Sequence, residues 1–99
     1  MEKLEITLKS QGNISADCTT AYDVRLSRPC TVGEFIRTVL ATFPNEWGTF
    51  RIYCMGVCEY RAGEVLKCDF SYDTLEREIY SISASGGWSR MDYLITLKV

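Results

Sequence analysis

The clearest hydrophobic pattern in the chain lies between Cys30 and Phe43. Thr31 and Glu34 have the spacing of a capping box, in which the threonine hydroxyl accepts a hydrogen bond from the backbone N–H of Glu34 and the glutamate reaches back to the N–H of Thr31. Pro44 cannot continue the helical hydrogen bonding, so the helix ends before it. We expect one amphipathic helix here, because six apolar residues recur at helical spacing on one face: Val32, Phe35, Ile36, Val39, Leu40 and Phe43.

Two alternating stretches precede this helix. Residues 3–9 switch strictly between apolar and polar side chains, and residues 20–27 alternate with Tyr22, Val24 and Leu26 inward, which is typical of half-buried strands. The segment Ser10–Asp17 between them is polar and contains a glycine, so it is predicted as a loop. The two strands are therefore expected to pair as an antiparallel hairpin.

Alternation returns after the helix. Thr49–Cys54 is predicted as a strand, with Arg51 and Tyr53 pointing away from the helix. Met55-Gly56 interrupts the pattern as a bulge or turn. Val57–Arg61 and Val65–Phe70 then flank a short glycine-containing segment, which predicts a second hairpin.

The last third of the chain is less clearly patterned. Residues 71–74 are predicted as a turn, in which Asp73 is a candidate cap for a short helical turn. Residues 76–84 fit helix or strand, and we favour strand because β-branched and aromatic residues accompany a serine run. Ser85–Gly87 is predicted as a tight turn and Trp88–Val99 as a closing strand. The apolar Leu94 interrupts the alternation of this strand, which suggests that part of the strand is covered on both faces. The prediction is one α+β domain over residues 1–99, with a single helix on a mixed or antiparallel sheet.

The order of a hairpin, a capped helix and a strand that pairs back resembles the ubiquitin-like β-grasp over residues 3–54. Leu4–Lys9 resembles the opening strand, Tyr22–Leu26 the second strand, and Thr31–Ile36 the threonine-initiated start of the helix. The resemblance implies a β-grasp with one or more extra C-terminal hairpins. It also implies the common non-enzymatic use of that fold, which is a surface that binds another protein. Gly86-Gly87 is internal, so conjugation through a terminal Gly-Gly is not expected.

Composition and charge narrow the classes of function. The chain has no histidine, which excludes Ser-His-Asp and Cys-His nucleophile activation and imidazole acid–base chemistry. The net charge is −2, with five basic and six acidic residues in the first 50 positions and six and seven in the rest. No basic run attracts a nucleic-acid backbone or an anionic membrane. We therefore expect a protein that is not an enzyme, does not contact a membrane and does not favour nucleic acid.

The cysteines bear on compartment and metal binding. Their number is odd and the N-terminus lacks the features of an export signal, which predicts reduced thiols in a cytoplasmic protein. Cys54 and Cys58 have a spacing that suits a zinc ligand pair, but a second pair is missing. We expect no metal and no cofactor, and buried thiols at the five positions Cys18, Cys30, Cys54, Cys58 and Cys68.

The site hypothesis depends on aromatic and arginine side chains that the alternation directs away from the helix. Tyrosine, tryptophan and arginine on an exposed sheet face are typical of protein-binding hot spots. They also suit cross-strand pairs that seal the sheet, or stacking on single-stranded nucleic acid, and Trp88 fits both a folded and an exposed position. The candidate partner-binding residues are Arg51, Tyr53, Tyr60, Arg61, Trp88 and Arg90.

These observations favour a small non-enzymatic module that binds an unidentified protein, with a homodimer through the long C-terminal strand as one form of partner. Three alternatives stay open. The first is an inhibitor protein of the phage or mobile-element type, supported by the acidic segment 69–78. The second is a single-stranded nucleic-acid binder. The third is an enzyme that uses carboxylates or a thiol, for which Glu76 and Cys58 are the candidates.

Overall fold

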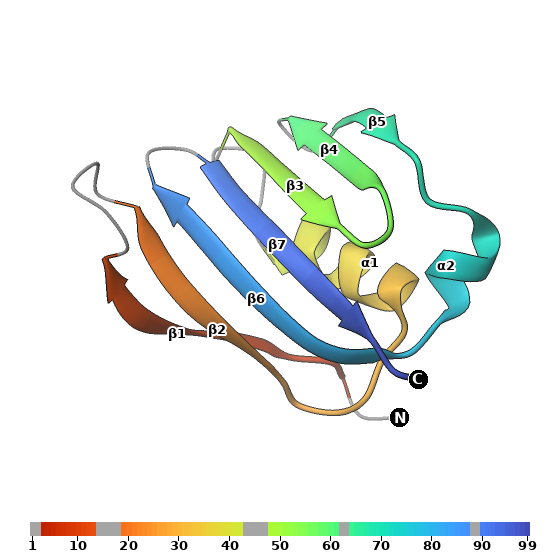
Figure 1. Ribbon diagram of the computed structural model, residues 1–99, viewed down its shortest axis with the longest axis horizontal. Coiled ribbons are helices and arrows are strands. Elements are labelled where there is room, and N and C mark those ends of the chain that lie inside the picture. The colour runs from red at the N-terminus through yellow and green to blue at the C-terminus, as the bar shows by residue number, and fades with distance from the viewer. Residues whose placement is uncertain (1–2, 14–18, 43–47, 62–63, 88–89) are drawn as a thin grey trace.

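The computed structural model describes residues 3–13, 19–42, 48–61, 64–87 and 90–99 (Figure 1). Their strands form one seven-stranded sheet in the order β1-β2-β6-β7-β3-β4-β5. β3 runs parallel to β7, and the other neighbouring strands are antiparallel. In Figure 1, α1 lies behind the sheet. The elements in chain order are β1 (Ile6–Asn13), β2 (Thr20–Leu26), α1 (Val32–Thr42), β3 (Thr49–Tyr53), β4 (Val57–Arg61), β5 (Glu64–Cys68), α2 (Tyr72–Glu76), β6 (Ile79–Gly87) and β7 (Arg90–Leu97).

A chain of aromatic rings ties α1 to the middle of the sheet. Phe35 of α1 is completely buried, and its ring meets Tyr93 of β7 edge to face with centroids 5.5 Å apart. Tyr93 in turn meets Phe50 of β3 edge to face at 6.3 Å. Phe50 stacks on Tyr60 of β4 at 4.8 Å. The burial of these rings provides a large apolar area and a defined geometry in one place, which fixes how the helix sits on the strands.

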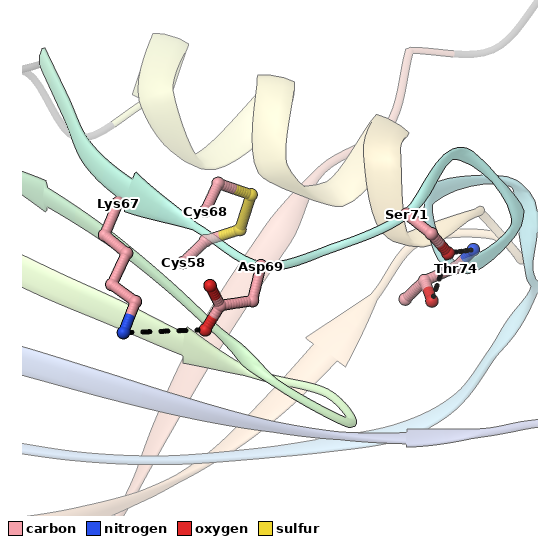
Figure 2. The surroundings of a disulfide bond; sticks show 6 residues. All are labelled: Cys58, Lys67, Cys68, Asp69, Ser71 and Thr74. Carbon is pink, nitrogen blue, oxygen red and sulfur yellow. Dashed lines mark hydrogen bonds and ion pairs between the residues drawn. A yellow bond between two sulfur atoms is a disulfide. The ribbon is translucent and has the colours of Figure 1, made fainter.

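The prediction of a β-grasp with a single helix is wrong. A second helix, α2, follows β5, and the side chain of Ser71 caps it by accepting a hydrogen bond from the N–H of Thr74 at 3.2 Å (Figure 2). More importantly, β3 does not pair back on the first hairpin, because β6 and β7 lie between β2 and β3. The expected extra C-terminal hairpin is thus the centre of a mixed sheet. It takes that place because Ile82 and Ile95, like Tyr93, are buried under the helix.

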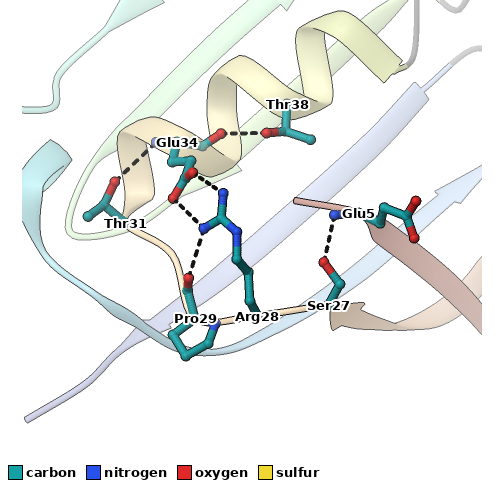
Figure 3. Close-up of polar contacts among 7 residues, drawn as sticks. All are labelled: Glu5, Ser27, Arg28, Pro29, Thr31, Glu34 and Thr38. Atoms are coloured by element: carbon teal, nitrogen blue, oxygen red, sulfur yellow. Dashed lines mark hydrogen bonds and ion pairs between the residues drawn. The ribbon is translucent and has the colours of Figure 1, made fainter. Parts of the chain in front are cut away.

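One of the two hydrogen bonds of the predicted capping box is present at the start of α1. The backbone N–H of Glu34 donates to Oγ1 of Thr31 at 3.2 Å (Figure 3). The glutamate does not reach back to Thr31, because its carboxylate is held by the guanidinium of Arg28 in a two-pronged ion pair. This hydrogen-bonded pair lowers the pKa of Glu34. The predicted helix end at Phe43 and Pro44 lies outside the described residues.

Two predicted loops prove to be strand. β1 continues to Asn13, through the first half of the stretch predicted as a loop, with a bulge between Ser10 and Gly12, and Gly12 has a φ of +99°. The predicted turn at Ser85–Gly87 belongs to β6, where Gly86 pairs with Met91. A Cβ at Gly86 would lie 2.5 Å from the carbonyl oxygen of Arg90, so glycine is required there for close strand packing and not for a turn.

The ambiguous segment of residues 71–84 contains both kinds of structure. Its beginning is α2, and Ser71 caps that helix in place of the predicted Asp73. Its remainder enters β6, as the preference for strand predicted. The predicted turn at Met55-Gly56 is also present, because both residues have positive φ, 54° and 145°. The suggestion that Leu94 is covered on both faces is wrong, since its side chain is 57% exposed.

Candidate functional site

The face of the sheet that points away from α1, here called the open face, carries most of the predicted site residues. Residues directly opposite each other in neighbouring strands share a face. Val24, Ile82 and Ile95 are opposite one another and are buried toward α1, so the positions next to them point the other way. In Figure 1 no helix of the described chain lies over this side. Three rows cross the open face: Asp23–Ser83–Leu94–Tyr53–Val57, Ala21–Ser85–Asp92–Arg51–Glu59, and Gly87–Arg90–Thr49–Arg61.

Four of the six predicted residues meet on this face. Arg51 and Tyr53 lie on β3, which has β7 on one side and β4 on the other. Arg61 of β4 and Arg90 of β7 both lie opposite Thr49, one strand to either side. Strands distant in the sequence thus bring these side chains together, although the local pattern along the chain gives no sign that they are neighbours.

Tyr60 is not part of the open face, and the prediction that it points away from the helix is wrong. It is only 3% exposed, and it lies opposite Phe50, on which it stacks. The register of the β3–β4 hairpin decides this, because Phe50 points inward and its opposite residue must do the same. Burial raises the pKa of the Tyr60 hydroxyl. Trp88, the sixth predicted residue, lies outside the described residues.

Opposite charges pair across the open face. Nε of Arg51 lies 3.0 Å from Oε2 of Glu59, and Nη2 of Arg90 lies 3.5 Å from Oδ2 of Asp92. The hydrogen bond to Glu59 raises the pKa of the Arg51 guanidinium, and Tyr53 contributes in the same direction. The face is therefore a mixture of both signs of charge.

A shallow concavity of about 520 Å³ lies in the open face, over β2, β6, β7 and β3. Oδ1 of Asp92 is buried at this place, and among the described residues it has no hydrogen-bond partner. An acceptor left in this state costs about 1–3 kcal/mol. Of these lining residues, sequence reasoning selected Tyr53 alone, although the apolar Leu94 at an outward position was a further signal. They include Asp23, Tyr53, Ser83, Ser85, Asp92 and Leu94.

A second concavity of about 670 Å³ opens where β2 and β6 separate beyond Val24 and Ile82. Its rim holds the ion pair between Nζ of Lys98 and Oε2 of Glu78, 2.9 Å apart. The enzyme hypothesis needed a pocket around Glu76 or Cys58. Neither residue lines either of these two concavities.

The prediction of five reduced thiols is wrong at two positions. Cys58 of β4 and Cys68 of β5 form a disulfide across the last pair of strands (Figure 2). Cys58 is therefore not available as a ligand beside Cys54. In the described part of the chain, no group of three or more His, Cys, Asp or Glu side chains is placed to hold a metal.

Cys30 and Cys54 are free and buried. Burial raises the pKa of the Cys30 thiol to about 11, with the carboxylate of Glu34 adding to the shift, and it raises the pKa of Cys54 as well. Thiols held in the protonated form are poor nucleophiles. Cys18 lies outside the described residues.

No helix in the described ranges is long and apolar enough to span a membrane. Comparison of the chain with protein-family models, with curated proteins and with solved structures gives no match. The function has to be argued from the geometry of the open face itself.

Proposed function

We propose that the protein is a non-enzymatic module that binds another protein through its open face. The observation that supports this most is the centre of that face, where the half-exposed Leu94 and the ring of Tyr53 adjoin the polar side chains of Ser83, Ser85 and Asp92 in one shallow concavity. An apolar centre with a few directed polar groups is the usual anatomy of a protein interface. Arg61 and Arg90 at its margin complete the pattern of residue types that dominate binding energy.

The partner is expected to present an apolar side chain to Leu94 and Tyr53, and hydrogen-bonding groups to the polar side chains of Ser83, Ser85 and Asp92 that line the same concavity. The ion pairs of Arg51 and Arg90 already neutralise the neighbouring carboxylates, so a neutral donor fits better than a second cation. A protein supplies both kinds of group on one surface.

A single-stranded nucleic acid fits this face less well. Its binding needs a basic track with several stacked rings. Tyr53 is the single aromatic side chain in the three described rows of the open face. The carboxylates of Asp23, Asp92 and Glu59 lie among the arginines of the same rows. A gel shift at low salt with single-stranded DNA and RNA is expected to be negative.

The inhibitor hypothesis rested on the acidic segment 69–78. Two of its carboxylates are paired with lysines, Asp69 with Lys67 at 3.8 Å and Glu78 with Lys98 at 2.9 Å. This segment therefore offers less free negative charge than its sequence suggests, and we favour the open face.

The test uses capture from an extract of the native host, read out by quantitative mass spectrometry. Leu94→Asp places a charge at the centre of the face, and Tyr72→Ala alters an even more exposed side chain on α2 as the control. We expect a protein that the wild type and the control enrich equally and that Leu94→Asp loses by about tenfold or more, since hot-spot losses exceed about 1.4 kcal/mol. Circular dichroism must show the same fold for all three.

A partner that Leu94→Asp retains in full would contradict the proposal. So would the absence of any specifically enriched protein together with a monomeric mass in light scattering. A dimer of this chain that Leu94→Asp converts to monomer would mean that the protein partner is a second copy.

A further inference from the structure

Few contacts hold the edge strand β5 to the rest of the sheet. All of its residues are exposed, and it is the last strand of the sheet, so it pairs with β4 on one side alone. The pairing is interrupted, because Lys67 lies opposite Glu59 and Val65 opposite Tyr60, which leaves Leu66 as an extra residue in a bulge. A short, bulged edge strand is the kind of element that opens locally before the rest of a fold.

The disulfide joins this strand to the core. Cys68 lies on β5 and is exposed, whereas Cys58 on β4 has no exposed surface and belongs to the hydrophobic core. Figure 2 shows the bond crossing from one strand to the other just before Asp69. After it, the N–H of Asp69 donates to the carbonyl of Val57 at 3.0 Å, and Phe70 packs against the core. These contacts limit how far any opening of β5 extends toward α2.

We propose that the Cys58–Cys68 disulfide is a redox-controlled cross-link, and that its reduction releases β5 from β4 while the rest of the sheet stays folded. The reductant is of the dithiol class. One of its thiolates attacks Sγ of the exposed Cys68, and the S–S bond breaks with Cys58 leaving as a thiolate that takes up a proton. The second thiol of the reductant then attacks the mixed disulfide, which frees and protonates Cys68. The protein gains two electrons and two protons, and the dithiol becomes a cyclic disulfide.

The other described thiols do not compete in this exchange. Cys30 and Cys54 are buried and free, and burial raises the pKa of both thiols, which keeps them in the protonated, poorly nucleophilic form. Resolution of the mixed disulfide is therefore left to the reductant, and the two-thiol state of the protein is well defined.

Release of β5 changes two surfaces. It exposes the backbone edge of β4, which is then able to accept another strand. It also moves Lys67 away from Glu59, and Glu64 away from Arg61. Glu59 and Arg61 lie at the margin of the open face. The redox state thus alters the surface on which partner binding is proposed, but the release itself does not depend on that proposal.

The test is hydrogen exchange read by mass spectrometry on the oxidised protein, before and after treatment with dithiothreitol. We expect the amides of residues 57–61 and 64–68 to exchange at least about tenfold faster after reduction, and those of β6 and β7 to change by less than about twofold. Cys68→Ser is expected to reproduce the reduced pattern. Lys67→Ser, its neighbour on the same exposed strand, keeps the disulfide and is the matched control.

Three results would overturn the proposal. The first is a non-reducing peptide map of the native protein that lacks the Cys58–Cys68 cross-link. The second is unchanged exchange of β5 after complete reduction. The third is equal acceleration in all strands, which would make the bond a requirement of the whole fold. Recovery of slow exchange on reoxidation would support the reversible form stated here.

Discussion

Replacement of Phe35 by alanine tests the packing of α1 on the sheet. The side chain has no exposed surface, and its ring is the first member of the aromatic chain that continues through Tyr93 and Phe50. Truncation removes the transfer free energy of the ring and leaves a cavity, which together cost about 3–5 kcal/mol for a buried phenylalanine. A domain of this size is stable by about 5–15 kcal/mol, so about a fifth or more of the total is expected to disappear.

The assay is urea unfolding followed by far-ultraviolet circular dichroism. The midpoint is expected to fall with little change in the dependence of free energy on urea, and the melting temperature to drop by more than about 12 °C. Phe35→Leu keeps most of the apolar volume and is expected to cost less than half as much. Tyr80→Ala, at a side chain that is 73% exposed, is expected to change stability by less than about 0.5 kcal/mol. A loss below about 1 kcal/mol for Phe35→Ala would refute the placement of α1 on this sheet.

Two further predictions concern the centre of the sheet. Gly86→Ala is expected to destabilise by about 1–3 kcal/mol, because its Cβ would meet the Arg90 carbonyl and the Met91 sulfur, and a thermal melt that is unchanged would contradict the close β6–β7 packing. Burial raises the pKa of Tyr93 to about 12. The contribution of this group to the free energy of unfolding is therefore fully present below about pH 10, the pKa of an unfolded tyrosine. It is lost as the pH rises toward 12. Absorbance at the phenolate band, recorded with circular dichroism, should show this hydroxyl ionising with unfolding, and its titration in the native protein near pH 10 would disprove the burial.

The sequence by itself determined the local elements. The apolar stripe, the Thr31 cap and the alternation at period two depend on neighbours within a few residues, so the helix, the first hairpin and the outward direction of Arg51 and Tyr53 were predicted. Even the short α2 has a local signal in the serine at its start, although the prediction selected Asp73 instead.

The tertiary structure alone decided which strands are neighbours. Nothing within β3 indicates that it pairs with β7 in parallel or that β6 separates it from β2, because such pairings join residues far apart in the chain. The same holds for Tyr60, which the hairpin register turns inward, and for Cys58 and Cys68, which become bonded only because β4 and β5 bring them opposite each other. Long-range contacts are selected by the joint burial of all strands under one helix, a free-energy balance that no short segment contains.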